Sequence, residues 1–435
     1  MYTSCPGETQ PWQDGAVPDD VVTPDPITLR SPGEGQVLEF LKPLPIAFGE
    51  AMSDDELQLE ERHLERDRVV GAFDGERQVG VAGAYTFRLT VPGGEVGAAG
   101  VTIVGVLPTH TRRGVLRRMM TWLIAQARER GEPVAILGAS EAAIYQRFGY
   151  GIATLRSEFE IEPLRATFLR PVPTTGQFRF VDTEEATALF PIVYDAVRRR
   201  TPGSLDRDAD AWRWGMAYDA EFMRAGNGPK SMAILEVDGE PRAYAIYRIK
   251  ADWEPRGPKN AMRVIELNGI EPEDEQAMWQ WLFRVDLVAS VRGHRQPVPH
   301  PLMLQLTEPR RLGIQVNDEM WLRILDVAPA LEGRSYAGSG SVTFELTDEF
   351  CPWNAGRWRL TVPGGGGVAS VEEGAADAAA DLALDISALS AIYLGGFTFA
   401  ELARAGRITE LRDGAIAAAD ALFVTAVKPW NSTPF

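Results

Sequence analysis

Apolar residues along the chain follow two spacings, and their alternation predicts strands and helices in turn. Residues 69–73 and 79–89 are apolar runs joined by Asp74-Gly75, a sequence typical of a β-hairpin turn. Residues 101–106 predict a further strand, and residues 134–138 predict a short buried one. Between those two strands the apolar positions repeat at helical spacing, on a stripe that packs against a sheet. The stripe consists of Val115, Leu116, Met119, Met120, Leu123, Ile124 and Ala127.

The first hairpin has an echo later in the chain. Residues 69–85 read VVGAFDGERQVGVAGAY, and residues 233–247 read AILEVDGEPRAYAIY. Each stretch contains an apolar run, an Asp-Gly-Glu sequence and a returning strand, and each is followed by another strand and a helix. This repetition indicates an internal duplication of one α/β module.

The chain changes character after residue 331. Strands predicted at 341–346 and 358–362 precede Ala-rich helical stretches from residue 382 onward, and the glycine run 364–367 favours a hairpin loop between strands. The first residues are acidic, rich in proline and poor in periodic apolar positions, which predicts a mobile tail outside the fold. The predicted fold class is therefore α/β and α+β, with a tail at 1–30 and domains at 31–162, 163–330 and 331–435.

A candidate anion site lies where the strand at 101–106 leads into the helix. The first turn of a helix has unpartnered backbone N–H groups and the positive end of the helix dipole, so it binds phosphates well. Arg112 and Arg113 add positive charge there, and Gly114 allows close approach of the backbone. The second copy has Glu-Pro-Glu-Asp-Glu at 271–275, and carboxylates repel a pyrophosphate. We therefore expect only the first copy to bind a phosphorylated cofactor.

Composition narrows the class of protein. A chain of 435 residues is long enough for about three domains, and its apolar and charged fractions of 45% and 24% are ordinary for a globular protein. The net charge of −17 argues against a nucleic-acid partner and suits a cationic small substrate better. We expect no membrane span and no signal peptide, because no apolar run of eighteen residues and no basic start with an apolar core is present.

Cysteine and histidine usage points away from disulfides and metals. Cys5 and Cys351 are too far apart in the sequence to indicate a disulfide framework, so a reducing cytoplasm is the expected compartment. The four histidines follow no metal-ligand spacing, and we expect no catalytic metal. They are His63, His110, His294 and His300.

Residues 101–130, followed by SEAAIYQRFGYG at 140–151, resemble the acyl-CoA-binding half of GCN5-related N-acetyltransferases. The wording PTHTRRGVLR at 108–117, APALEGRSYA at 328–337 and an aromatic last residue extend the resemblance to the enhanced-intracellular-survival (Eis) acetyltransferases, over roughly residues 35–435. The resemblance implies two acetyltransferase-like modules of which only the first is active, a sterol-carrier-like third domain and a homohexamer. It also implies acetyl-CoA as co-substrate and an amine acceptor, either an aminoglycoside modified at several positions or a lysine side chain.

Several residues acquire expected roles from this resemblance. The expected cofactor-binding residues are Val104, Gly105, Val106, Arg112, Arg113, Gly114, Val115, Leu116 and Ser140. On the strand, a backbone amide freed by a local distortion donates to the thioester carbonyl, and Gly105 favours a bulge there; a strand with every amide paired is the alternative. Ser140 either contacts the cofactor or caps the following helix. Thr111 and Leu116 depart from the wider family, where Gln or Arg and a small residue are common.

The resemblance assigns Tyr145 as the general acid to the leaving thiolate and the α-carboxylate of Phe435 as the general base. A half-buried structural tyrosine and a frayed chain end are the alternatives. An α-carboxyl titrates near 3.5 in water, so it needs burial to act as a base near neutral pH. Phe48 and Glu50 are the expected substrate-binding residues. Pro434 stands where some members have an acidic residue, which favours weaker binding of highly cationic acceptors.

A different class of function competes with the enzyme. In that alternative, the sterol-carrier-like domain binds an apolar ligand and the first module has lost activity. The Arg112-Arg113-Gly114 turn, Tyr145 and the free end at Phe435 favour the enzyme.

Overall fold

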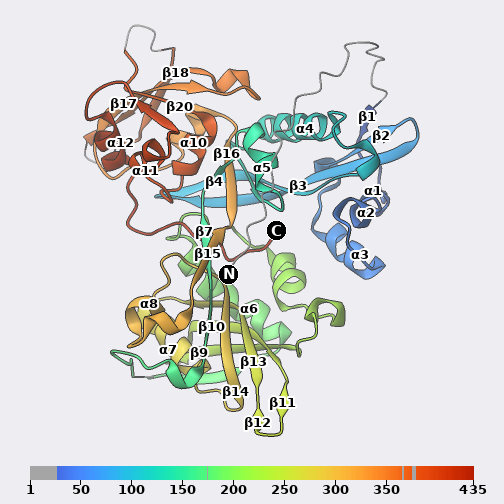
Figure 1. Ribbon diagram of the computed structural model, residues 1–435, viewed down its shortest axis with the longest axis vertical. Coiled ribbons are helices and arrows are strands. Elements are labelled where there is room, and N and C mark those ends of the chain that lie inside the picture. Colours follow the sequence, from blue (N-terminus) through green and yellow to red (C-terminus); the bar gives the residue numbers. More distant parts are fainter. Residues whose placement is uncertain (1–26, 174, 365–366, 375–378) are drawn as a thin grey trace, which may run out of the picture.

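The computed structural model describes residues 27–173, 175–364, 367–374 and 379–435, and it has three parts (Figure 1). Two seven-stranded sheets belong to the duplicated modules, and a five-stranded sheet belongs to the C-terminal part. The chain does not end inside the C-terminal part. It runs back to the middle of the molecule, between the two modules (Figure 1).

The first sheet has the strand order β1-β2-β3-β4-β5-β16-β6. Its strands are β1 (Ile27–Arg30), β2 (Val69–Asp74), β3 (Arg77–Val91), β4 (Gly94–Val106), β5 (Val134–Gly138), β16 (Met320–Ile324) and β6 (Gly151–Ile152). Neighbouring residues on β2 enter different cores: Val70 packs with helix α4 (Val115–Glu129), and Val69 packs with the N-terminal helices. Helices therefore cover both faces of this sheet. The N-terminal helices are α1 (Val37–Leu41), α2 (Leu44–Phe48) and α3 (Asp54–His63).

Strand β1 corrects the expectation that residues through Arg30 lie outside the fold. Ile27 to Arg30 pair with Asp74 to Gly71 of β2, and Ile27 is buried. Arg30 also forms an ion pair with Glu76. Four residues are too few for an alternation of apolar and polar positions to stand out beside a polar, Pro-rich stretch, so the strand is set by pairing with β2. The rest of the predicted tail, residues 1–26, lies outside the described residues.

Two helices of this module begin and pack as their sequences favour. Helix α3 begins with a capping box, in which the Ser53 hydroxyl accepts from the Glu56 N–H and the Glu56 carboxylate accepts from the Ser53 N–H. Helix α4 buries its apolar stripe, with Met119 and Met120 fully covered. The short α5 (Ala142–Tyr145) follows β5.

The second sheet has the matching order β8-β9-β10-β13-β14-β7-β15, read from the opposite end. Its strands are β8 (Gln177–Phe180), β9 (Lys230–Val237), β10 (Glu240–Lys250), β13 (Asn260–Gly269), β14 (Val288–Gln296), β7 (Leu155–Ile161) and β15 (Gln315–Asp318). Its helices are α6 (Thr183–Arg198), a π-helix (Ala211–Ala217), α7 (Pro272–Leu282) and α8 (Leu302–Gln305). A small hairpin of β11 (Trp253–Glu254) and β12 (Gly257–Pro258) projects from it.

The two modules exchange one strand each. Strand β16 lies between β5 and β6 of the first sheet, although it follows β15 in the chain, and β7 lies between β14 and β15 of the second, although it follows β6. The duplication is thus visible in the topology. The domain boundaries at 162 and 330 stay predictions. With these boundaries, β7 lies in the first segment but joins the second sheet, and β16 lies in the second segment but joins the first sheet.

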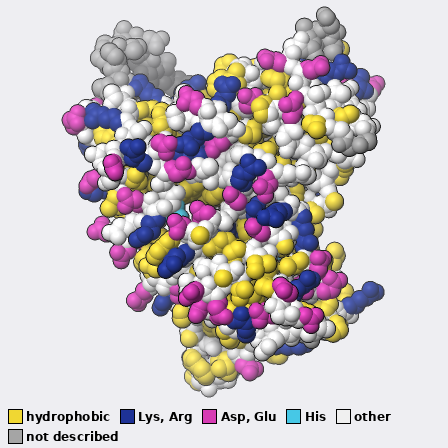
Figure 2. Space-filling model, turned by 180° about the vertical axis from the view of Figure 1, so that it is seen from behind, with side chains coloured by type: hydrophobic (Ala, Val, Ile, Leu, Met, Phe, Trp, Pro, Cys, Tyr) yellow, Lys and Arg dark blue, Asp and Glu magenta, His cyan; other side chains and the backbone are white. Residues whose placement is uncertain are grey.

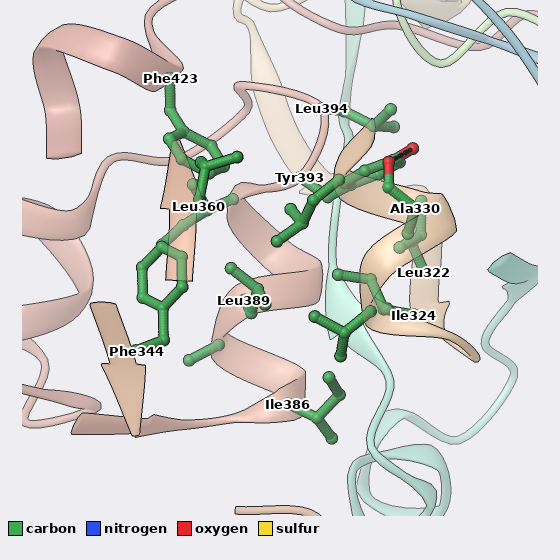
Figure 3. Close-up of a cluster of buried hydrophobic side chains, with 14 of the residues drawn as sticks. Leu322, Ile324, Ala330, Phe344, Leu360, Ile386, Leu389, Tyr393, Leu394 and Phe423 are labelled. Atoms are coloured by element: carbon green, nitrogen blue, oxygen red, sulfur yellow. Dashed lines mark hydrogen bonds between the residues drawn. The ribbon is translucent and has the colours of Figure 1, made fainter. Parts of the chain in front are cut away.

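The third part has the sheet order β19-β18-β17-β20-β21. Its elements are α9 (Val327–Glu332), β17 (Gly340–Thr347), β18 (Gly356–Val362), β19 (Ser370–Glu373), β20 (Leu382–Asp385), α10 (Ile386–Ile392), α11 (Phe399–Arg404), β21 (Ile408–Glu410) and α12 (Ala415–Phe423). Its core is continuous with β16, because Leu322 and Ile324 face Ile386 and Leu389 of α10 (Figure 3). Phe344 stacks on Phe399 inside the same core. The predicted glycine loop includes residues 365–366, which lie outside the described residues.

The described helices are all too short or too polar to cross a lipid bilayer. On the face in Figure 2, Lys and Arg side chains lie among Asp and Glu and do not gather into one basic patch.

Candidate active site

Strand β4 carries the predicted distortion, two residues earlier than expected. Gly83 of β3 pairs with Thr102, and Val81 pairs with Gly105, so β4 has one extra residue between those pairs. Ile103 lies in this bulge with φ 50. Gly105 was expected to favour a bulge in this strand, and the bulge lies directly before it, between Thr102 and Gly105. Gly105 itself serves close packing, because a Cβ atom there would lie 2.9 Å from the Cβ of Ala47 in α2.

Strands β4 and β5 separate next to the bulge. Their parallel pairing covers Ala98 to Gly100 on β4, and beyond Gly100 no described strand pairs with that edge of β4. β5 continues on its other edge with β16. A Cβ atom added at Gly138, the end of β5, would meet nothing within 4 Å. Val104 and Val106 are half-buried on the open stretch, so an extended ligand can lie between the strands and bond their amides.

The start of α4 has the geometry of an anion site. Gly114 is the N-cap with φ 76 and gives no side-chain cap bond, so the first N–H groups of the helix face outward. Arg112 and Arg113 are exposed beside it, whereas Val115 is buried. Leu116 is half-buried and packs on the module core.

The turn before α4 is braced by Asp74, the last residue of β2. Its Oδ2 atom lies 3.2 Å from Nε2 of the buried His110 and 3.4 Å from a guanidinium nitrogen of Arg113. No structural role was predicted for His110 from the sequence. The hairpin turn and the helix start are thereby held as one unit, which keeps the donors of the anion site in place.

Ser140 and Tyr145 follow β5. Ser140 is exposed and does not cap α5, whose N-cap is Glu141 and has no side-chain cap bond. Tyr145 is the last residue of α5 and is 7% exposed. Burial, and to a smaller degree the nearby Glu141 carboxylate, raise the pKa of Tyr145 to about 12. Its ring meets Tyr150 edge to face at 5.9 Å.

The C-terminal tail reaches the first module along the second. Trp430 donates from its backbone N–H to Pro202 O at 2.9 Å and from its indole N–H to Arg295 O at 3.0 Å. Thr433 is buried. The ring of Phe435 then packs edge to face on Phe87 of β3, with centroids 5.3 Å apart. The chain end is therefore docked on the protein. This differs from the frayed terminus that was the alternative expectation from the sequence.

Phe435 lines a cavity of about 590 Å³ between the two modules. The cavity is acidic. The acidic side chains in its lining are those of Glu60, Glu65, Asp206, Asp208 and Asp210, and of these Glu65 pairs with Arg130. Two of its cations are already neutralised, because Arg207 pairs with Glu266 and Arg295 pairs with Glu319. Thr102, next to the bulge of β4, is also part of the lining, so the cavity adjoins the distorted strand.

Neighbouring groups orient the acidic side chains of the cavity. The hydroxyl of Tyr85 donates to Glu60, and that of Thr86 donates to Glu65. The Asp206 carboxylate accepts from the Arg88 N–H at 2.7 Å, and burial raises the pKa of Asp206 above its usual value. On the far wall Arg62 of α3 lies over the ring of Trp214, 4.7 Å from its centroid.

The cavity differs from the predicted substrate site. Phe48 and Glu50 do not line it; Phe48 lies at the end of α2, and its ring would be 3.6 Å from a Cβ atom at Gly105. Tyr145 is not among the described lining residues either. Sequence reasoning missed the aspartates at 206, 208 and 210. Their alternation in LDRDADAW at 205–212 was the available signal.

The second module has no comparable anion site at its matching helix. Helix α7 starts with a capping box of Glu271 and Asp274, in which the Asp274 carboxylate accepts from the Glu271 N–H. Pro272 has no N–H, and the N–H groups of Asp274 and Glu275 donate to the Glu271 carbonyl oxygen, so these groups are not free for an anion. A Cβ atom at Gly269 of β13 would lie only 2.3 Å from the Glu275 nitrogen, so the helix start packs directly on the strand end. This geometry supports the prediction of a single cofactor site.

Residues that fit acetyl-CoA are therefore present in the first module: an open strand edge, a bulge and an uncapped basic helix start. Among the described residues no group of three or more His, Cys, Asp or Glu side chains is arranged as metal ligands.

Comparisons with known proteins agree with this reading. Residues 28–153 and 203–324 each match an acetyltransferase (GNAT) domain family, and residues 327–432 match a sterol carrier protein domain family. The N-acetyltransferase Eis of Mycobacterium tuberculosis is 35% identical over 369 residues, covering 82% of this chain and 86% of that protein. A protein of Streptomyces avermitilis named as an uncharacterized N-acetyltransferase is 38% identical over 384 residues, covering 88% of this chain and 93% of that protein.

Solved structures give the same result. The crystal structure of Eis1 from Mycobacterium abscessus matches with a TM-score of 0.79 and 32% identity, covering 94% of this chain and 100% of that one. A GCN5-related N-acetyltransferase from Anabaena variabilis matches with a TM-score of 0.80 at 19% identity, which supports the fold alone. The predicted fold of two acetyltransferase modules and a sterol-carrier-like domain is confirmed.

Proposed function

This chain belongs to the Eis family of GCN5-related N-acetyltransferases, and from that premise we propose that it acetylates a small polycationic amine in the cavity at Phe435. The carrying observation is the docked chain end: Phe435, the residue that bears the terminal α-carboxylate, lines an acidic cavity beside the bulge of β4. Acetyl-CoA, the acyl donor of such enzymes, supplies the thioester.

The first module supplies the donor site in this proposal. Backbone N–H groups at the start of α4, together with Arg112 and Arg113, hold the pyrophosphate. Val104 and Val106 offer amides along the open edge of β4, and the bulge at Ile103 frees one to polarise the thioester carbonyl.

One group takes a proton and a second stabilises the leaving group. The α-carboxylate of Phe435 accepts a proton from the substrate ammonium, so that the free amine becomes the nucleophile. Tyr145 keeps its proton at every pH up to about 11 because its pKa is about 12, and its hydroxyl donates a hydrogen bond to the departing thiolate. Burial of Tyr145 supports this division, since a buried phenol is kept neutral.

The acceptor is an amine with several positive charges. Five side-chain carboxylates spread around a cavity of about 590 Å³ support binding in more than one orientation, as an aminoglycoside acetylated at several positions requires. A lysine side chain presents a single ammonium and uses fewer of these carboxylates. The exposed Pro434 contributes no charge beside the terminus, which favours weaker binding of the most highly charged acceptors.

The remaining assignments follow from the family. We expect a homohexamer working in the cytoplasm, a second module without catalytic activity, and domains at 31–162, 163–330 and 331–435. The core of the third part around Phe344, Leu389 and Phe423 is filled by side chains and offers no space for the apolar ligand of the carrier alternative (Figure 3).

One extension of the chain tests the proposal. Adding a single glycine after Phe435 moves the α-carboxylate by one residue, and we expect kcat to fall by at least about 100-fold. Thiol release from acetyl-CoA is measured with aminoglycosides, linear polyamines and lysine peptides as acceptors. The control is Phe435→Leu, which keeps the carboxylate at the same chain length, and we expect it to retain activity within about tenfold.

The proposal fails if the extended enzyme turns over like the wild type. It also fails in its substrate assignment if neutral monoamines are acetylated as efficiently as polycationic ones.

A further inference from the structure

The last residues of the chain are held by the second module. Nε of Arg207 donates to the Thr433 hydroxyl at 3.0 Å, and a terminal nitrogen of the same guanidinium donates to the Ser432 hydroxyl at 3.3 Å. The Tyr194 hydroxyl of α6 lies 2.9 Å from Thr433 Oγ1. Both tail hydroxyls belong to buried residues. This contact set ends two residues before Phe435.

Arg207 is fixed on every side. Its two terminal nitrogens donate to the two carboxylate oxygens of Glu266 at 2.9 and 2.6 Å, and both side chains are 1% exposed. Its guanidinium carbon also lies 4.0 Å from the ring centroid of Tyr194 and 4.9 Å from that of Trp212. A planar, bidentate and buried guanidinium has little freedom, so the donors that it offers to the tail have defined positions.

Glu266 stands at the point where the second sheet repeats the bulge of the first. Ile246 of β10 pairs with Glu266, and Tyr247 pairs with Val264, so β13 has an extra residue here, as β4 has at Ile103. In the first module this point is the edge of the proposed acetyl site. In the second module a buried carboxylate and its arginine fill it.

We propose that the second module is an anchor for the chain end: Arg207, oriented by Glu266, is a positioning residue that sets where the Phe435 carboxylate lies in the first module. The inference rests on the proposed role of Phe435. Only two residues follow Thr433, and they span at most about 7 Å. The anchor therefore restricts the position of the carboxylate to a small volume. A misplacement of about 1 Å costs a reaction up to about 100-fold.

The test removes the tail hydroxyls and leaves the ion pair alone, because replacing Arg207 would strand the Glu266 charge in the interior. The variant is Ser432→Ala with Thr433→Val. The matched control is Thr425→Val, since the Thr425 hydroxyl is buried in the same C-terminal segment and has no hydrogen-bond partner. Thr433→Ser is the conservative variant that restores a hydroxyl.

Two measurements are made on the full chain. Release of Phe435 by carboxypeptidase Y, followed by mass spectrometry, reports whether the tail is anchored. Steady-state kinetics with acetyl-CoA and a polyamine report kcat and KM. We expect the double variant to lose Phe435 at least about tenfold faster and to lose at least about tenfold in kcat, with the KM for acetyl-CoA within about twofold of wild type. Thr425→Val and Thr433→Ser are expected to behave as wild type.

An unchanged rate of Phe435 release overturns the anchor. Faster release with an unchanged kcat leaves the anchor standing and overturns the proposed role of the Phe435 carboxylate, so the two ideas fail separately. A fall in kcat that Thr425→Val shares equally also overturns the inference, because it reports a general loss of packing.

Discussion

The two modules share a topology and differ at the same two places, the start of one helix and the end of another. The first module starts α4 with the uncapped Gly114 beside two exposed arginines, whereas the second starts α7 with a capping box of carboxylates. After the following strand, α5 ends in Tyr145 and α8 ends in Gln305. One copy thus has an uncapped basic helix start and a tyrosine at the end of the second helix, and the other has neither.

The difference shows how a duplicated fold divides labour. The sheet, its bulge and its flanking helices are built by apolar patterning, which tolerates many sequences, so both copies keep them. Binding and catalysis depend on a few groups at strand and helix ends, which change without loss of the fold. The two copies are also joined physically, by the exchanged strands and by the C-terminal tail that the second copy holds.

The sharpest way to test the comparison is to remove the hydroxyl of Tyr145, for which we proposed a role at the leaving thiolate and which has no counterpart at the end of α8. Tyr145→Phe is expected to lower kcat by about 100- to 10,000-fold while the KM for acetyl-CoA stays within about threefold, because the hydroxyl acts on the leaving thiolate and not in binding. In wild type, a pKa of about 12 keeps Tyr145 protonated, so its own titration should not lower kcat below about pH 11.

The control for this variant is Tyr150→Phe, since the Tyr150 hydroxyl is buried without a hydrogen-bond partner and its ring adjoins that of Tyr145. It should leave kcat near the wild-type value. If both variants lose activity equally, the effect belongs to packing and Tyr145 is not the acid.

A smaller effect on ligand binding is expected when the basic start of α4 is given a negative charge, as at the start of α7. Arg112→Glu should raise the dissociation constant for coenzyme A by about 10- to 100-fold, because one charge-assisted hydrogen bond is replaced by repulsion. Isothermal titration measures it, together with the stoichiometry, which should be one per chain. Arg404→Glu makes the same charge change on an exposed arginine of α11 and serves as the control. Two coenzyme A sites per chain would contradict the comparison, because the second module would then bind the cofactor as well.

The sequence predicted those parts of the fold and site that depend on neighbours in the chain. The Asp-Gly hairpins, the stripe of α4 and the basic turn at Arg112 follow from local spacing, and the structure has them where they were expected. Strand β1, the exchanged strands and the pair of Arg207 with Glu266 depend on contacts between distant segments, which no periodicity encodes.

The same limit explains the substrate residues. Phe48 and Glu50 were expected to bind the acceptor, but the nearby acidic residue that lines the cavity at Phe435 is Glu60 of α3. Which of three short helices faces the cavity is decided by packing: Leu44 and Ala47 of α2 lie against Gly105, and this turns α2 toward β4.

The smallest effect concerns the closed helix start of the second module. Burial raises the pKa of Glu275 to about 7, against an ordinary value near 4.3. As pH rises from about 4.5 to 7, the unfolded chain releases this proton and the folded chain keeps it, so the free energy of unfolding falls over that window.

Glu275→Gln removes this dependence. Relative to wild type, its free energy of unfolding should rise by about 1–3 kcal/mol between pH 4.5 and pH 8 in denaturant titrations. Glu273→Gln, at an exposed position of the same turn, should change nothing. Parallel pH curves for Glu275→Gln and wild type would mean that water reaches this carboxyl, and then the α7 start would be more open, and closer to that of α4, than its packing on Gly269 implies.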